Sequence, residues 1–236
     1  MRQNYTRFFW EKEGLGERGE CVGELAEWDK NVVEQNCLLL IRYVCLILKK
    51  MDDLAEHIQK YIAPSEADLQ AILNRFKKRT LKKGRHLLKS GQTSQEFMFI
   101  GAGCLRVFAE NETGEITGWF AFEGEFFCEL SSFLSQIPSK FSVQALEDTS
   151  LYYLTRADLE QLYRDLPVWQ ELMRKFWEQI IMHMVAHIVS FQTETAEARY
   201  QRALQHPQLM QRVPLKHLAS YLGVTPTSLS RLRKRK

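Results

Sequence analysis

The chain has 236 residues, of which 45% are hydrophobic and 26% are charged, and its formal net charge is +3. These values are typical of a folded protein of one or two domains and exclude a disordered chain. The five cysteines contain no CxxC pair. We therefore expect reduced thiols in a cytoplasmic protein rather than a disulfide framework or a zinc site.

The N-terminal 50 residues differ in composition from the rest. Their apolar run Cys37–Leu48 is interrupted by Arg42 and, at about 12 residues, is too short to cross a bilayer. It also lies too far from the terminus for a signal peptide, so no membrane partner is expected. Residues 1–50 are either an upstream extension, with Met51 as the natural start, or an extra helix at about 33–49 that packs on the body.

From Met51 onward the hydrophobic pattern is clear. Apolar residues at helical spacing predict helices at 52–62 and 65–76, the second capped by Ser65. The period then changes to two, and glycine-rich turns separate the apolar segments. The predicted strands are 85–89, 96–100, 104–109, 116–122, 141–147 and 150–154. Six short strands with such turns predict an antiparallel sandwich or barrel.

A long helix is predicted after Pro167, following a shorter one that starts near Arg156. Its apolar residues recur at threes and fours over about six turns, a stripe wider than one small barrel needs. Two such helices could pair in a dimer; alternatively, the helix is buried against its own barrel. The candidate dimer interface is Trp177, Ile181, Met184 and Ile188.

The segment 213–236 has the spacing of a helix-turn-helix. A first apolar face is followed by Gly223, where a tight turn needs a left-handed residue. Thr225 is a good N-cap, and Pro226 suits the first turn of a second helix. The residues predicted to face outward and contact DNA are Thr225, Thr227, Ser228, Ser230, Arg231, Lys234 and Arg235. The alternative is a small helical hairpin with a solvated basic tail.

Charge supports the first interpretation. Residues 199–236 contain nine Lys or Arg and no Asp or Glu, which leaves 23 basic and 29 acidic residues elsewhere, a net charge of −6. A basic end on an acidic body is what attraction to phosphate requires, whereas a solvated surface would mix its signs. A dimer would also place two reader helices one DNA turn apart, as a two-fold-symmetric operator requires.

In this order of elements the chain resembles the Crp/Fnr family of bacterial transcription regulators, from about residue 52 to 236. The most specific stretch is 124–148, which looks like the phosphate-binding cassette of that family. The resemblance implies an α+β fold: a double-stranded β-helix (β-roll or jelly roll) sensor domain, a long dimerisation helix and a C-terminal helix-turn-helix. The domains would be 51–163, 164–195 and 196–236, after the N-terminal 1–50.

The cassette departs from the members that bind cyclic AMP. The resemblance implies that Glu129, with Leu130, would hold the ribose, but Cys128 replaces a glycine, and Ser139 with Lys140 replaces an Arg-Ser pair. A lysine cannot make the bidentate phosphate contact of an arginine. The candidate effector site is thus Glu129, Leu130, Ser139 and Lys140, with an effector other than cyclic AMP, or none.

The reader helix also departs from the cyclic-AMP-responsive members. An Arg and a Glu that read bases there are matched here by Pro226 and Thr227, whereas Arg231 matches a basic base-contacting position. The resemblance therefore implies the fold and its groove, but not the target sequence.

Three other groups of side chains have alternative interpretations. His183 and His187 have the i, i+4 spacing of metal or haem ligands, but no carboxylate completes an HExxH pattern, and we expect interface or surface histidines. Cys104 and Cys128 could sense redox state or be buried and inert. Three aromatic residues of one strand could line an effector pocket or fill the core: Trp119, Phe120 and Phe122.

The sequence thus predicts a homodimeric, cytoplasmic, DNA-binding transcription regulator with no metal or cofactor. Its partners would be an operator of two-fold symmetry and a second copy of the chain, with RNA polymerase as a further candidate. The alternative is a regulatory or protein-interaction module that does not bind specific DNA. No phosphate loop, nucleophile elbow or acid pair supports an enzyme.

Overall fold

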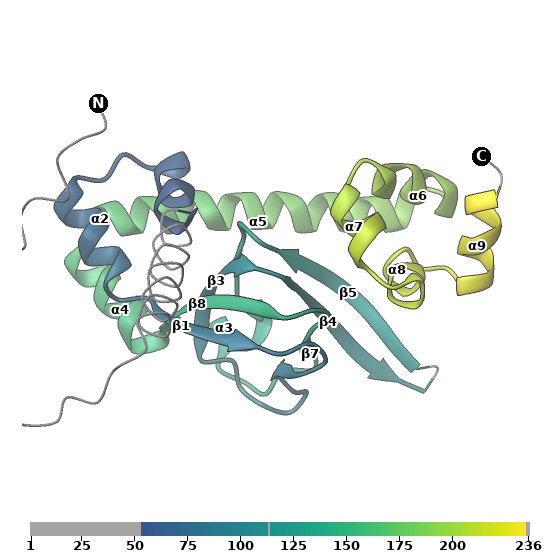
Figure 1. The fold of residues 1–236 in the computed structure, drawn as a ribbon, viewed down its shortest axis with the longest axis horizontal. Helices are drawn as coiled ribbons and strands as arrows, with labels where there is room; N and C mark the ends of the chain where they lie inside the picture. The colour runs from purple at the N-terminus through teal and green to yellow at the C-terminus, as the bar shows by residue number, and fades with distance from the viewer. Residues whose placement is uncertain (1–52, 113, 235–236) are drawn as a thin grey trace, which may run out of the picture. The chain divides into compact units, whose positions relative to one another are not determined.

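The computed structural model describes residues 53–112 and 114–234 of the chain. The expected N-terminal extension or helix at 1–50 and the candidate DNA contact Arg235 lie outside these ranges. In the described ranges, no helix is long and apolar enough to cross a membrane. Figure 1 shows two antiparallel sheets, a long helix and a C-terminal group of short helices.

Two four-stranded sheets form the roll. The first has the order β1 (Lys77–Leu81), β8 (Thr149–Thr155), β3 (Glu96–Ala102), β6 (Phe126–Phe127). The second has the order β2 (His86–Leu88), β7 (Ser142–Ala145), β4 (Cys104–Asn111), β5 (Gly114–Phe122). Every pairing is antiparallel. The predicted fold class, an antiparallel roll followed by helices, is confirmed.

Helices lie before, between and after the strands of the roll. Residues 53–61 are helical. The other helices are α2 Glu66–Leu73, α3 Leu130–Ser135, α4 Arg156–Asp165, α5 Pro167–Thr193, α6 Ala196–Leu204, α7 Pro207–Arg212, α8 Leu215–Tyr221 and α9 Pro226–Lys234. Ser65 caps α2 as predicted, since its hydroxyl accepts from the Asp68 N–H at 3.1 Å. Pro167 occupies the first turn of α5, where a missing N–H costs nothing.

Side-chain alternation divides the interior into three cores. Along β3, Met98 and Ile100 lie in the core between the sheets, whereas Phe97 and Phe99 pack with residues of α2, α4 and the first half of α5. Along β5, Phe120 and Phe122 lie in the third core, which also contains buried residues of α6–α9. The C-terminal helices therefore pack on the outer face of the second sheet.

Several elements were not predicted. Strand β1 is a highly charged segment that nevertheless pairs with β8 over five residues. Helix α2 ends three residues before the predicted Phe76. The short elements β6, α3, α6 and α7 have too little periodicity of their own to predict.

Candidate DNA-binding surface and effector cavity

Helices α8 and α9 form a helix-turn-helix. Leu218, Ala219 and Leu229 are 1%, 0% and 0% exposed, so the two helices meet closely at the small Ala219. Gly223 has φ 69°, and a Cβ there would lie 2.9 Å from a ring carbon of Phe191. Glycine is required at this turn for both reasons.

The second helix starts as its sequence dictates. The Thr225 hydroxyl accepts from the Ser228 N–H at 3.1 Å and lies 2.9 Å from the Ser228 hydroxyl. Pro226 is the first helical residue. The predicted N-cap is therefore the observed one, and it sets the start of α9.

The outward face of α9 is polar and basic. Five of the predicted DNA contacts are exposed there: Thr225, Thr227, Ser228, Arg231 and Lys234. Ser230 is half-buried. The last turn of α9 contains Arg231, Arg233 and Lys234. Because the buried face carries Leu229, the side chains that could enter a DNA groove are not used in packing.

Polar contacts fasten the helix-turn-helix to the roll. The Ser220 hydroxyl of α8 accepts from the Thr117 N–H at 2.9 Å and donates to the Glu115 carbonyl at 3.1 Å. At the end of α7, the Arg212 guanidinium donates to the carboxylates of Glu123, at 2.6 Å, and of Glu147. These two carboxylates raise the pKa of Arg212, so its charge is fixed.

A cavity of about 390 Å³ lies between the roll and α5. Its walls come from the roll, from the helix at 53–61 and from the middle of α5. The rings that line it belong to His57, Tyr61, Trp119, Phe126, Phe127, Phe141, Phe176, Trp177, His183 and His187. Trp119 thus lines a cavity, as one interpretation had it, whereas Phe120 and Phe122 pack against the C-terminal helices.

The four predicted effector residues are not brought together. Glu129 and Leu130 line this cavity, and Glu129 also lines a second cavity of about 290 Å³ whose walls come from both sheets. Ser139 and Lys140 line neither cavity. The Ser139 hydroxyl is 4% exposed and bonds the backbone of Phe141, accepting from its N–H at 2.9 Å. Lys140 is exposed to solvent.

Glu129 is used within the cassette itself. It is the N-cap of α3, and its carboxylate accepts from the N–H groups of Ser131 and Ser132 at 3.3 and 3.0 Å and from the Ser131 hydroxyl at 2.7 Å. These three donors satisfy the carboxylate without a ligand. The role in ribose binding that the resemblance implied would require these bonds to be shared.

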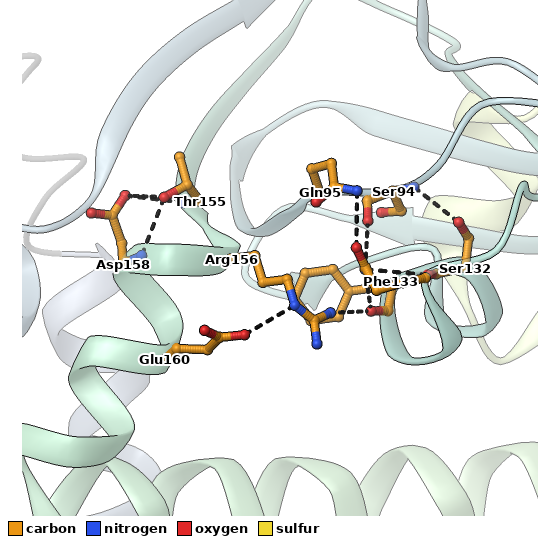
Figure 2. Close-up of polar contacts among 9 residues, drawn as sticks. Ser94, Gln95, Ser132, Phe133, Thr155, Arg156, Asp158 and Glu160 are labelled. Carbon is orange, nitrogen blue, oxygen red and sulfur yellow. Dashed lines mark hydrogen bonds and ion pairs between the residues drawn. The ribbon is translucent and has the colours of Figure 1, made fainter.

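Side-chain hydrogen bonds also hold the C-terminal end of α3, as Figure 2 shows for Phe133 and Arg156. The Phe133 carbonyl accepts from the Gln136 amide at 2.8 Å and from the Arg156 guanidinium at 2.7 Å. Gln95 donates to the Gln136 side chain at 3.0 Å. Gln136 itself has φ 55°, the left-handed conformation that ends a helix. Polar side chains of the cassette, together with Gln95 and Arg156 from outside it, therefore hold α3 in place.

The interface residues predicted on α5 divide into two groups. Trp177 is half-buried and packs on Phe176 with ring centroids 4.7 Å apart, so it belongs to the chain's own core. Ile181, Met184 and Ile188 are 58%, 43% and 52% exposed. The first half of α5 is thus buried against its own roll, and the second half presents a bare apolar stripe.

The contacts of the histidines and of the Cys104 thiol favour structural roles over metal binding or redox sensing. Among the described residues, no group of three His, Cys, Asp or Glu side chains could hold a metal ion. The His187 ring stacks on Tyr221 at 5.3 Å and meets Trp119 edge-on at 5.9 Å, whereas His183 is exposed. Burial raises the pKa of the Cys104 thiol to about 12. At neutral pH this thiol is protonated, which favours the inert interpretation.

Comparison with known proteins agrees with this architecture. Residues 78–165 match the family model described as cyclic nucleotide-binding domain. The "Cyclic AMP receptor protein" of Thermus thermophilus is 33% identical over 108 residues, which are 45% of this chain and 49% of that protein. The match therefore spans about half the length of this curated relative.

Two solved structures share the fold. FixK2 from Bradyrhizobium japonicum superimposes with a TM-score of 0.59 at 19% identity, over 68% of this chain and 83% of its own. CLP, the c-di-GMP-responsive global regulator of Xanthomonas campestris, has a TM-score of 0.59 at 15% identity, over 72% of this chain and 91% of its own. Residues 78–165 therefore match a cyclic nucleotide-binding domain, and the chain shares the fold of these two solved structures.

Proposed function

We propose that this protein is a homodimeric regulator that binds an operator of two-fold symmetry through α9 and responds to a small effector other than cyclic AMP. The observation that carries the proposal is the outward face of α9. Five candidate contacts on it are exposed, whereas Leu229 on its opposite face is fully buried. This is the arrangement that a recognition helix needs.

The electrostatics of the C-terminal helices fit a polyanionic partner. From residue 199 to 234 the sequence has no Asp or Glu, and Arg231 and Lys234 both extend from the exposed face of α9. Arg199, Arg202 and Arg212 are engaged with backbone or carboxylate groups within the protein. The basic residues left for phosphate are Lys216, which is exposed on α8, and the five from Arg231 to the end of the sequence.

Dimerisation supplies the second half of the site. The exposed Ile181, Met184 and Ile188 recur at three and four residues along α5, as in the seam of a helix pair. Pairing at this seam relates two copies of α9 by a two-fold axis. Each copy then reads one half-site of a symmetric operator.

The test is DNA binding across a salt series. Operator fragments selected from genomic DNA are measured by fluorescence anisotropy with the full chain, between about 50 and 200 mM salt. We expect affinity to fall steeply with salt. Arg231→Ala should cost about 1–3 kcal/mol and relax preference at one base position, whereas Lys234→Ala should weaken all sequences alike.

Arg85→Ala is the matched control, because it removes one exposed positive charge from the roll rather than from α9. It should leave operator affinity unchanged. Binding that is indifferent to salt, or an Arg85 variant as damaged as the Arg231 variant, would contradict the proposal.

A further inference from the structure

Ten of the 21 residues that line the 390 Å³ cavity carry flat aromatic rings. Trp119, Phe126 and Phe141 come from the roll, Trp177 comes from α5, and His57 comes from the helix at 53–61. Rings prefer to meet other rings stacked or edge-on. The volume lies at the small end of ligand sites, which span about 300–1,000 Å³, and so suits a molecule of one or two fused rings.

The charges around the cavity oppose an anion. Among its described lining residues there is no Lys or Arg, and the two carboxylates present belong to Glu125 and Glu129. Glu129 already accepts three hydrogen bonds at the start of α3. A phosphate placed here would meet two carboxyl groups, one of them Glu125, whose pKa burial raises to about 7, and no lysine or arginine. Its own charge would be buried without a partner, which is costly.

His57 adds no positive charge at neutral pH. Its ring lies 5.1–5.2 Å from the rings of Tyr61, Phe99 and Phe126. Burial, and secondarily Lys60, lowers the pKa of His57 to about 4. The wall is therefore aromatic and neutral on this side.

From these walls we infer that the cavity binds a small, uncharged, planar aromatic molecule. The inference rests on the proposed function for its regulatory role, because there this molecule is the effector. The proposed dimer also bears on the site: Ile180, Met184 and Ile188 line the cavity, and the last two lie on the bare stripe of α5. A partner helix on that stripe would border the ligand and exclude water from it.

The cavity is one side chain away from the helix-turn-helix. His187 lines it, and the same ring stacks on Tyr221, the last residue of α8, at 5.3 Å. Tyr221 in turn meets Phe120 of β5 at 5.3 Å. A ligand that displaces Trp119 or His187 therefore acts on α8 through direct ring contacts.

Calorimetry with the full chain tests the ligand class. The probes are indole and 2-naphthol, which are neutral, indole-3-acetate, which adds a carboxylate to the same ring, and cyclic AMP. We expect both neutral probes to bind and the two anions to bind at least about tenfold more weakly. The inference would be overturned if either anion bound more tightly than the neutral probes, or if neither neutral probe bound up to about 1 mM.

Gly118→Leu locates the site. Gly118 lines the cavity, its φ is not in the left-handed region, and a Cβ there meets no atom within 4 Å. The variant fills space without removing packed atoms, so indole binding should weaken at least about tenfold with the melting temperature retained. Ile116→Leu, exposed on the same strand and outside the cavity lining, is the control and should bind as the parent does.

A second variant protects the test against misfolding. Trp119→Leu removes one ring wall and should also weaken indole binding about tenfold. If both cavity variants bind indole as the parent does, the site lies elsewhere and the inference is wrong. Operator binding is measured separately: indole binding without operator binding would refute the proposed function alone, and the reverse would refute only the cavity inference.

Discussion

Ile188→Glu probes the proposed seam of α5, which consists of Ile181, Met184 and Ile188. Complete burial of such side chains is worth about 1.5–3 kcal/mol each. They are 58%, 43% and 52% exposed in the single chain. Burial in a dimer would therefore add roughly half of that free energy, about 1 kcal/mol per side chain. Six side chains from two protomers then contribute about 6 kcal/mol.

The substitution removes two of these six contributions and places two carboxylates in one apolar seam. The lost burial costs about 2 kcal/mol, and the unpaired charges add at least as much again. Since each 1.4 kcal/mol is a factor of ten, the dimer dissociation constant should rise at least about a thousandfold. The fold of each chain should survive, because Ile188 is exposed within its own chain.

Sedimentation equilibrium over a concentration series measures this constant. Ala186→Glu is the control: Ala186 is exposed on the same turn but lies on another face of α5, so its variant should remain dimeric. Operator affinity should fall with loss of the dimer. If Ile188→Glu has the parent's dissociation constant, the seam is not the interface and the reasoning fails.

Two further predictions concern the cassette and the cavity wall. Glu129→Ala should lower the free energy of unfolding, measured in urea, by about 1–2 kcal/mol because α3 loses its cap. Calorimetry should detect no cyclic AMP binding to the parent or the variant below about 1 mM. A variant as stable as the parent, or micromolar cyclic AMP binding, would contradict this. The pKa of His57 is lowered to about 4 in the folded chain, so the unfolded chain binds more protons below pH 6.5 and stability should fall as pH decreases from 6.5 to about 4. His57→Phe should flatten this dependence in urea midpoints measured across that range, and an unchanged slope would show that other groups cause it.

Local rules were sufficient where a residue's role is set by its own segment. Ser65, Gly223 and Thr225 occupy the cap and turn positions that their chemistry favours, and alternation located most strands. Strand β1 was missed because its sequence is nearly all polar, and only pairing with β8 makes it a strand. No property of residues 77–81 alone contains that information.

The same limit explains Glu129. Its position in the cassette matched a ribose ligand of the family, and sequence reasoning carried that role across. The structure places the carboxylate against the N–H groups of Ser131 and Ser132, two and three residues along the chain. A cap and a ligand contact require the same residue type at the same place, so only the geometry of α3 distinguishes them.

The aromatic cavity depends on contacts between distant segments and could not be found from any one of them. His57 and Trp119 precede His187 by 130 and 68 residues, and the three line one cavity only because α5 packs along the roll. The spacing of His183 and His187 on one helix is compatible with metal ligands and with interface or surface histidines. The contacts of His187 with Trp119 and Tyr221 instead place this histidine between the cavity and the helix-turn-helix. A ring in that position can respond to a ligand and move α8, which neither helix periodicity nor charge would have indicated.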